Sequence, residues 1–432
     1  MYFRARRAGL SAVILALGVV ISNIDAAFAV DSGYTPLGVH MGSFYLYPVA
    51  EVGLEYDDNV FRLPDQIENE TDALVRDAGA DSILRVKAAI TANSDWNRHA
   101  LNGFASLNLG KYNEYKKQDF ENYALGGDGR LDIKRGSYAT GRIGIRKRNE
   151  SRSSVNSHVG GEGSPLAYGV EPTPIHTKYV GAGFDYRPAR LGFSFDLDYR
   201  TLEYENVDNV FGGEIDNSDR DRSVPHAIAR ISYEVMPQRR VYVEGRVDRV
   251  EYDQEIDQNG IERSSSGYKV TGGMSFDLTN LLVGDVFAGY LEQNYDSPTQ
   301  ADISSNLLGA HLQWFPSRLT SVNFGLDSNV EESTDKTVSG YLRTTARIGV
   351  IHELKRNIIL SANADHTQNK FKQNEPDRKE LETITGFDLE GRYLISRRLY
   401  TALRFRHEYR ESDIKFQEYT NNRALLTLGA NW

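Results

Sequence analysis

Apolar and polar side chains alternate with a period of two along most of the chain after Tyr47. In the segment 191–200, LGFSFDLDYR, the odd positions are apolar or aromatic and the even positions are small or polar. The segments 342–350 and 399–410 repeat this split. Successive side chains of a β-strand point to opposite sides of a sheet. The pattern therefore predicts many strands, each with one apolar face and one polar face.

The connections between these segments alternate between tight and long. Tight turns are expected near 95–97, 134–136, 187–190, 236–239, 279–280, 315–318, 353–355 and 396–397, and long polar stretches at 58–79, 150–174, 205–222 and 253–266. Short turns on one rim and long loops on the other are typical of outer-membrane barrels. This alternation of short turns and long loops predicts an all-β fold: a single up-and-down antiparallel transmembrane β-barrel of roughly eighteen strands.

A soluble periplasmic β-sandwich would show similar alternation and is the main alternative fold. Its strands average only about 5–6 residues, whereas many segments here reach roughly twelve or more. The chain also ends on an amphipathic strand in which Leu426, Leu428, Ala430 and Trp432 share one face. A closing strand with a terminal aromatic residue resembles the recognition signal of the barrel-assembly machinery, so Trp432 is the expected assembly signal and the barrel is favoured.

The first 29 residues have the pattern of a secretory signal peptide. Arg4, Arg6 and Arg7 precede a short apolar stretch, and Ala27-Phe28-Ala29 supplies the small residues of a cleavage site. The stretch is shorter than the ~20 residues of a membrane-spanning helix. We therefore expect a signal peptide over 1–29, a periplasmic N-terminal segment over 30–45 and an outer-membrane β-barrel over 46–432.

The parity of the strands assigns a side to each charge. Turning an arginine of the segment 398–410 toward lipid would cost roughly 2–4 kcal/mol near the midplane, so its charges should face the interior. The same argument predicts that the following residues line the lumen: Arg142, Arg146, Arg148, Asp196, Asp198, Arg200, Glu244, Arg246, Asp248, Arg343, Arg347, Asp388, Glu390, Arg392, Arg404, Arg406 and Glu408.

A barrel of this size is wide enough to hold water, which favours a hydrated channel. The alternative is a wall that these charges merely solvate, without any specific substrate. Both signs are interleaved, so strong ion selectivity is not predicted. Inward aromatics such as Tyr242 and Tyr400 would allow sugars to slide by stacking and hydrogen bonding.

The amino-acid composition argues against several classes of function. The chain has no cysteine, a net charge of −10 and nine histidines without metal-ligand spacing, so we predict no thiol chemistry, no nucleic-acid binding and no metal site. No Gly-x-Ser-x-Gly motif is present, and no catalytic residue or cofactor is assigned. The glycines of 126–129 and 160–163 are interpreted as loops or strand bends. The Asx clusters 57–59 and 327–329 could hold calcium but are more typical of turns.

One segment near the start is more specific. The stretch 38–62 contains Gly42-Ser43-Phe44 and a Pro at position 48, then Tyr56-Asp57-Asp58-Asn59-Val60-Phe61. It resembles the opening strand of the outer-membrane family called putative β-barrel porin 2. The resemblance implies a porin associated with exopolysaccharide export, with no catalytic motif to carry over.

We therefore expect an outer-membrane porin through which an extracellular polysaccharide leaves the cell. The expected partners are outer-membrane lipid, the barrel-assembly machinery, a periplasmic polysaccharide-export protein and the polysaccharide itself. A porin for general or small-solute diffusion is the second hypothesis. A hydrolase or deacylase with a site at the rim is the third.

Overall fold

The computed structural model describes residues 34, 36–64, 79–159, 167–209, 212–279, 281–374, 381–413 and 417–432. The expected signal peptide and the glycines of 160–163 lie outside these residues. Within the described part of the chain, no helix has the length and apolar character needed to span a membrane.

Eighteen long strands form the molecule, and each is hydrogen-bonded to two neighbours in antiparallel register. Their bounds are β2 Phe44–Asp57, β3 Asp81–Ser94, β4 Ala100–Tyr112, β5 Phe120–Lys134, β6 Ser137–Asn149, β9 Pro174–Tyr186, β10 Leu191–Tyr204, β13 Arg222–Met236, β14 Arg239–Tyr252, β15 Ser265–Leu278, β16 Leu282–Tyr295, β17 Ile303–Ser317, β18 Thr320–Glu332, β19 Val338–Lys355, β20 Ile358–Gln373, β21 Leu381–Leu394, β22 Leu399–Ser412 and β23 Tyr419–Asn431.

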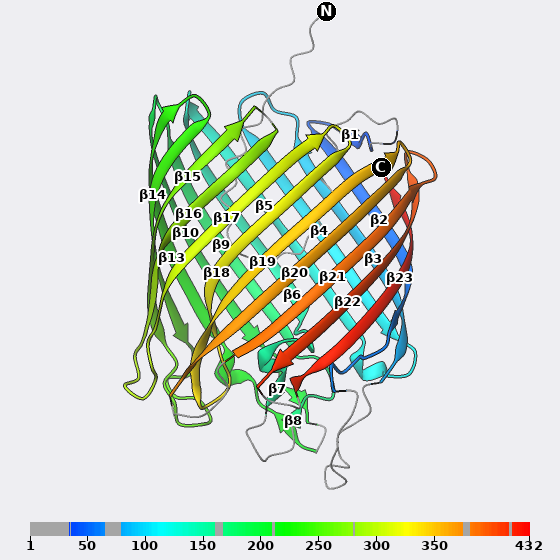
Figure 1. Cartoon of the computed structure of the whole chain (residues 1–432), viewed down its shortest axis with the longest axis vertical. Helices are drawn as coiled ribbons and strands as arrows, with labels where there is room; N and C mark the ends of the chain where they lie inside the picture. Colours follow the sequence, from blue (N-terminus) through cyan, green and yellow to red (C-terminus); the bar gives the residue numbers. More distant parts are fainter. Residues whose placement is uncertain are drawn as a thin grey trace, which may run out of the picture.

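The sheet closes on itself between its first and last long strands. β2 pairs with β3 along one edge and with β23 along the other, from Val49 opposite Asn431 to Asp57 opposite Arg423. Closure leaves no unpaired strand edge, which is what a lipid environment requires. Figure 1 shows the resulting cylinder of tilted strands. The predicted fold class and strand number are confirmed.

The two ends of the cylinder differ. One end, here called the short-turn rim, carries the tight connections, and β1 (Val39–Met41) and the C-terminus lie there (Figure 1). The other end, the long-loop rim, carries the long connections. These include the short pairs β7 (His158–Val159) with β8 (Ala167–Tyr168) and β11 (Val207–Asp208) with β12 (Glu214–Ile215), and the 3₁₀ turns η2 (Lys116–Gln118), η3 (Val155–Ser157) and η4 (Ser218–Arg220).

Two expected turns lie two or three residues later than the sequence indicated. Positions 315–317 of the first turn still belong to β17 and positions 353–355 of the second belong to β19. The chain reverses only after Ser317 and Lys355. Both strands contain a register shift just before they end. A bulge of this kind accommodates a residue such as Pro316, which has no backbone N–H to donate, without ending the strand.

The glycine run 126–129, interpreted as a loop or a strand bend, lies inside β5, so the loop interpretation is wrong. A Cβ added to Gly126 would lie 2.8 Å from the carbonyl oxygen of Ile143 and 2.9 Å from the Tyr179 hydroxyl. The glycine is therefore needed for close approach between neighbouring strands, a role that turn propensity does not reveal.

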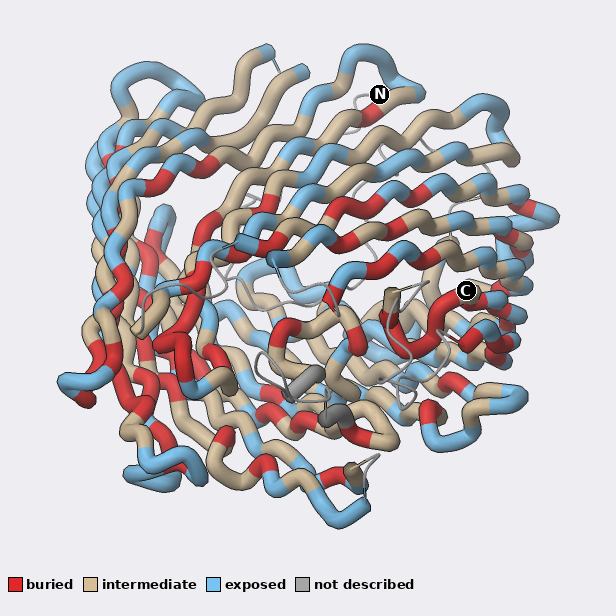
Figure 2. The backbone as a smooth tube through the Cα atoms, turned by 60° about the horizontal axis from the view of Figure 1, so that its bottom comes forward, coloured by how far each residue is buried: buried red, intermediate tan, exposed pale blue. Residues whose placement is uncertain are grey.

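The wall has its apolar side chains on the outside. Val52 and Leu54 of β2, Leu389 of β21 and Leu403 of β22 are among many exposed large hydrophobics, with exposed fractions of 47–63%. Figure 2 turns the long-loop rim toward the reader and shows exposed and less exposed residues alternating along the strands. The three hydrophobic clusters of the described residues lie toward the long-loop rim, so the middle of the cylinder has no apolar core.

Part of the segment 30–45, which is expected to be periplasmic, is joined to the barrel. β1 pairs with the start of β2 through a two-residue turn, with Met41 opposite Phe44. Gly42 has φ +62° in this turn, a conformation that favours glycine. The Phe44 ring meets Trp96 of the next short turn edge-on at 5.7 Å. The Gly42-Ser43-Phe44 part of the motif therefore builds a small hairpin at the short-turn rim.

Candidate functional site

The inner face of the cylinder carries the charges. All seventeen residues expected to face the lumen lie on the face opposite the exposed apolar residues; Arg404 and Arg406, for example, alternate with Leu403 and Phe405. Their placement follows from the alternation of side chains along each strand, which puts every second residue on the inner face of the closed ring. That they line a water-filled passage stays a prediction.

One part of this inner face is a network centred on Arg406. Its guanidinium binds Asp365 of β20 at 3.1 Å, Asp388 of β21 at 2.5 Å and Glu408 of its own strand at 2.6 Å. Arg404 shares Asp388 at 2.6 Å. One guanidinium thus holds three carboxylates on three strands, so no single sign of charge dominates here.

A second network lies on β6, β10 and β13. Arg142 pairs with Asp198 and approaches Asp196 at 3.5 Å, and His226 lies 3.7 Å from Asp198. The other pairs that involve predicted residues join side chains of the same or neighbouring strands: Arg230 with Glu244 at 2.6 Å, Arg246 with Asp248 at 3.2 Å, Arg392 with Glu390 at 2.9 Å and Arg343 with Asn369 at 3.0 Å.

Some predicted residues are less engaged. Arg347 is 3.8 Å from Asp327, and 60% of its side chain is exposed. The Nε atom of Arg200 is buried and has no hydrogen-bond partner among the described residues. The inner wall is therefore mostly charge-compensated, and Arg347 is only loosely paired.

Aromatic rings on the inner face lie over glycines of the adjacent strand. A Cβ added to Gly429 would come within 2.2 Å of the Tyr400 ring, and one added to Gly273 within 2.6 Å of the Tyr242 ring. The same arrangement joins Phe120 to Gly110, Tyr179 to Gly144 and Phe287 to Gly309. Because glycine has no side chain, each ring can lie along the wall. These pairs extend from the short-turn rim to the long-loop rim.

The long connection between β6 and β9 reaches across the mouth of the barrel. The Asn156 side chain donates to the carbonyl oxygen of Glu332 at 3.1 Å and accepts from the N–H of Thr334 at 3.1 Å. Val155 packs with Val338, Tyr341 and Phe371 of β19 and β20. These strands lie on nearly the opposite side of the ring from β6 and β9. The segment 150–159, here called the crossing segment, therefore spans the mouth at the long-loop rim.

Further contacts tie the loops to one another. Arg263 binds Asp257 at 2.6 Å within one loop and donates to the carbonyl oxygen of Ser333 in another at 2.7 Å. Burial alone would raise the pKa of Asp257, but the Arg263 hydrogen bond and the N–H groups of Ile261 and Asn259 hold this pKa below its ordinary value. At the base of the crossing segment, Arg220 binds Glu150 at 2.9 Å.

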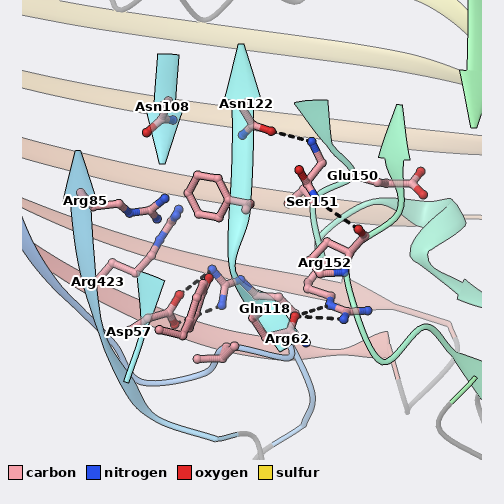
Figure 3. Close-up of a pocket in the computed structure, with 15 residues that line it drawn as sticks. Asp57, Arg62, Arg85, Asn108, Gln118, Asn122, Glu150, Ser151, Arg152 and Arg423 are labelled. Carbon is pink, nitrogen blue, oxygen red and sulfur yellow. Dashed lines mark hydrogen bonds and ion pairs between the residues drawn. The ribbon is translucent and has the colours of Figure 1, made fainter. Parts of the chain in front are cut away.

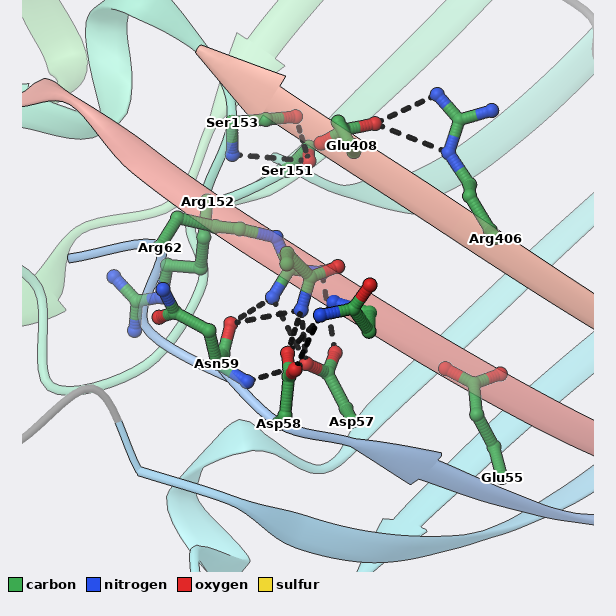
Figure 4. Close-up of polar contacts among 12 residues, drawn as sticks. Glu55, Asp57, Asp58, Asn59, Arg62, Ser151, Arg152, Ser153, Arg406 and Glu408 are labelled. Carbon is green, nitrogen blue, oxygen red and sulfur yellow. Dashed lines mark hydrogen bonds and ion pairs between the residues drawn. The ribbon is translucent and has the colours of Figure 1, made fainter. Parts of the chain in front are cut away.

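The motif Tyr56-Asp57-Asp58-Asn59-Val60-Phe61 fastens the end of β2 to β23 (Figure 4). Asp57 accepts the Asn421 side-chain amide at 2.6 Å, and Asp58 accepts the backbone N–H and the side-chain amide of Asn422, both at 2.7 Å. Asn59 donates to the carbonyl oxygen of Thr420 at 2.9 Å. We call this group the seam clasp, because it bridges the strands at which the barrel closes.

The rest of the motif has two environments. Tyr56 is exposed on the outer face, whereas Val60 and Phe61 are buried in a cluster with Leu63. No group of three or more metal-ligating side chains occurs within the described residues, and the carboxylates of the seam clasp are bound to amides and to Arg62. Asp57 accepts the backbone N–H of Asn59 at 3.0 Å, the hydrogen bond of an Asx turn, so the turn interpretation of 57–59 is supported.

Trp432 follows β23 at the short-turn rim. Its N–H donates to the carbonyl oxygen of Pro48 at 3.2 Å, so the last residue is joined to the first long strand. Its role as an assembly signal stays a prediction.

Sequence reasoning did not single out Arg62, Arg85, Asn156, Arg263 or Arg423. For Arg423 a signal existed, because the outward parity of Leu426 and Leu428 places position 423 on the inner face. Asn156 and Arg263 lie in loops without periodicity, and their partners are about 70 residues away or more. No local pattern indicates such contacts.

A family model agrees with this architecture. The family model described as putative β-barrel porin 2 matches residues 31–431. No curated protein is similar enough in sequence to match. Solved structures that align with the chain include the copper transporter OprC (10% identity, 91% of this chain and 81% of that one, TM-score 0.45). Others are OpdL of Pseudomonas aeruginosa (10%, 91% and 100%, TM-score 0.44) and OccK1 (OpdK) of the same organism (9%, 90% and 99%, TM-score 0.43).

Likeness of this degree to solved structures says nothing about what the chain transports. The family match covers nearly the whole chain and agrees with the opening-strand motif, the closed ring of strands and the charged inner face. The chain belongs to the putative β-barrel porin 2 family.

Proposed function

We propose that the protein forms an aqueous passage in the outer membrane through which an exopolysaccharide leaves the cell. The observation that carries this proposal is the composition of the inner face. Its charges are largely paired with one another, as Arg406 is with Asp388, so a solute is not held by strong unpaired charge. Half-buried inner rings such as Tyr179 and Phe287 lie along the wall and offer surfaces suited to sugars. Tyr400 and Tyr242, which the sequence suggested for this role, are buried beneath Arg392 and Arg230.

The proposal includes the orientation of the barrel and its partners. The short-turn rim faces the periplasm and the long-loop rim faces outward, as is usual for outer-membrane barrels. The exposed apolar wall contacts outer-membrane lipid. The barrel-assembly machinery inserts the chain through the strand that ends at Trp432, and a periplasmic polysaccharide-export protein delivers the polymer to the short-turn rim.

A second candidate, diffusion of small solutes, is favoured by the crossing segment. The contacts of Asn156 and Val155 with the opposite wall narrow the mouth, and a polymer needs more room than a small sugar. The two candidates differ in whether the crossing segment must move. Export requires it to leave the mouth, whereas small-solute diffusion does not.

Transport by the full-length protein in liposomes distinguishes the candidates. Export predicts that vesicles loaded with exopolysaccharide of the producing strain release it through the protein, and that a deletion strain retains its polymer. Release of monosaccharides but not polymer, together with normal secretion by the deletion strain, would overturn export and leave the diffusion porin. Vesicles as tight as protein-free ones would contradict both.

A further inference from the structure

A pocket of about 230 Å³ lies on the inner face beneath the loops of the long-loop rim. β2 to β6 and β23 contribute to it, together with the start of the crossing segment. Four arginines, Arg62, Arg85, Arg152 and Arg423, line this pocket, whereas only two carboxylates, Asp57 and Glu150, do so. A cationic pocket is unexpected in a chain with a net charge of −10.

Three of the four arginines already have partners. Arg62 binds Asp57 at 3.1 Å, Arg85 binds Glu55 at 2.8 Å, and Arg152 donates to the Gln118 side chain at 2.9 Å. The second carboxylate of the pocket, Glu150, is bound to Arg220 of another loop. Glu408, Glu55 and Asp57 lie near enough to interact with the charge of Arg423, but each is bound directly to another arginine, and no described carboxylate forms an ion pair with Arg423 itself.

Arg423 points into the pocket beside Arg85 (Figure 3). Its Nε is buried and makes no hydrogen bond with any described residue. An enclosed guanidinium beside other cations is unfavourable unless an anion satisfies it. Because the guanidinium presents two parallel N–H groups, it can bind a carboxylate or a phosphate through two hydrogen bonds, and the test below distinguishes the two anions.

Amide side chains surround this guanidinium. Asn108, Asn122 and Asn149 line the pocket, and Asn122 is fixed by accepting the backbone N–H of Asn149 at 2.8 Å. The Oδ1 atom of Asn149 is buried without a hydrogen-bond partner among the described residues. Amides both donate and accept, so they suit a ligand rich in hydroxyl groups.

We propose that this pocket binds a sugar unit that carries a carboxylate, with the carboxylate on Arg423 and the hydroxyl groups on Asn108 and Asn149. The inference deepens the proposed function and rests on it in one respect, because the bound unit is taken to be part of the transported polymer. It identifies that polymer as one that contains acidic sugars.

Binding to the purified full-length protein in detergent tests this inference without requiring transport. Titration with glucuronate, glucose, acetate and inorganic phosphate, followed by calorimetry, measures each affinity. Glucuronate is expected to bind more tightly than the other three. Arg423→Gln should weaken it roughly tenfold or more, as expected for the loss of a charged hydrogen bond. The matched control is Arg249→Gln, because Arg249 is paired with Asp296 at 2.5 Å and does not line the pocket; it should leave the affinity unchanged.

The other outcomes each overturn part of the proposal. Equal binding of acetate, phosphate and glucuronate would show a simple anion site without sugar recognition. If glucose binds as tightly as glucuronate, the carboxylate does not contribute to recognition. If no probe binds, or if Arg423→Gln has no effect, the pocket is not a binding site for acidic sugars. If Arg423→Gln does not fold, Asn108→Ala provides the second test and should weaken glucuronate. Polymer release from liposomes is measured separately, so failure of this site and failure of the passage are distinguishable.

Discussion

Asn156 donates its side-chain amide to the main-chain carbonyl of Glu332 at 3.1 Å. Asn156 belongs to the connection between β6 and β9, whereas Glu332 ends β18, which lies on nearly the opposite side of the ring. The Asn156 side chain also accepts the N–H of Thr334. A contact of this kind makes the crossing segment a strap over the mouth whose position depends on a few hydrogen bonds. It also makes the strap's contribution measurable with a single substitution.

Removing the Asn156 contacts should open the mouth. A net contribution of about 1 kcal/mol per hydrogen bond corresponds to roughly a fivefold change in the balance between closed and open positions. Asn156→Ala is therefore expected to show a higher mean conductance than the unmodified protein in planar bilayers. Ser153→Ala is the control, because Ser153 bonds only within the crossing segment, to Ser151. Identical conductance of all three proteins would show that the segment does not limit the passage.

Loss of the seam clasp should weaken the barrel where it closes. Asn421→Ala removes a 2.6 Å hydrogen bond to the buried, charged Asp57, which keeps its bonds to Arg62 and to the N–H of Asn59. We expect the free energy of unfolding to fall by about 1–3 kcal/mol. Urea titration of the protein in detergent measures this. Glu203→Ala, which breaks an exposed pair with Lys178, should cost at most about 1 kcal/mol. Equal losses in the two variants would contradict a special role for the seam.

Acid should loosen the loops that Arg263 holds. Because the pKa of Asp257 is lower in the folded protein than in the unfolded chain, its carboxylate stabilises the fold above the unfolded pKa. That contribution is lost as the pH falls through the folded pKa, below about 4. Hydrogen exchange of residues 253–264 should therefore stay slow from pH 7 to pH 5 and become faster, relative to the intrinsic rate, only in stronger acid.

The variant Asp257→Asn separates this group from the other carboxylates. It should show the faster exchange already at neutral pH and little further change in acid. Loosening of the unmodified protein between pH 7 and pH 5 would point to a different titrating group.

Ion selectivity should depend on Arg406. Arg406→Gln leaves Asp365, Asp388 and Glu408 without their shared cation, although Asp388 keeps Arg404. The interior then gains net negative charge, so the reversal potential in a salt gradient should shift toward cation selectivity. Arg404→Gln should shift it less, because Arg404 binds only Asp388 and its side chain is 43% exposed. A larger shift for Arg404→Gln would contradict the network.

The fold could be predicted from the sequence because strand parity is a local property. The alternation LGFSFDLDYR at 191–200 is enough to separate Phe195 from Asp196, and the ring repeats that separation. Turn chemistry alone misled at Pro316, where a bulge lets β17 continue, and at Gly126, whose space is needed by the strand partner.

The candidate site was less accessible to sequence reasoning. Arg423 lacks a direct ion pair within the described part of the chain because the neighbouring carboxylates bind other arginines: Asp57 binds Arg62, and Glu150 binds Arg220. The crossing segment depends on contacts between Asn156 and residues 332–334, which are distant in the sequence. Neither relationship leaves a periodic signal, because both arise only once the ring has closed.

If the barrel spans a membrane as proposed, its charged inner side chains face enclosed water and their immediate neighbours on each strand face lipid. The chain has no cysteine, so single cysteines can be introduced without a background. Leu403→Cys and Arg404→Cys place a thiol on adjacent positions of β22 with opposite predicted faces. In proteoliposomes, a charged, membrane-impermeant thiol reagent should label position 404 and leave position 403 unlabelled. Equal labelling of the two positions, or labelling of 403 alone, would contradict the account.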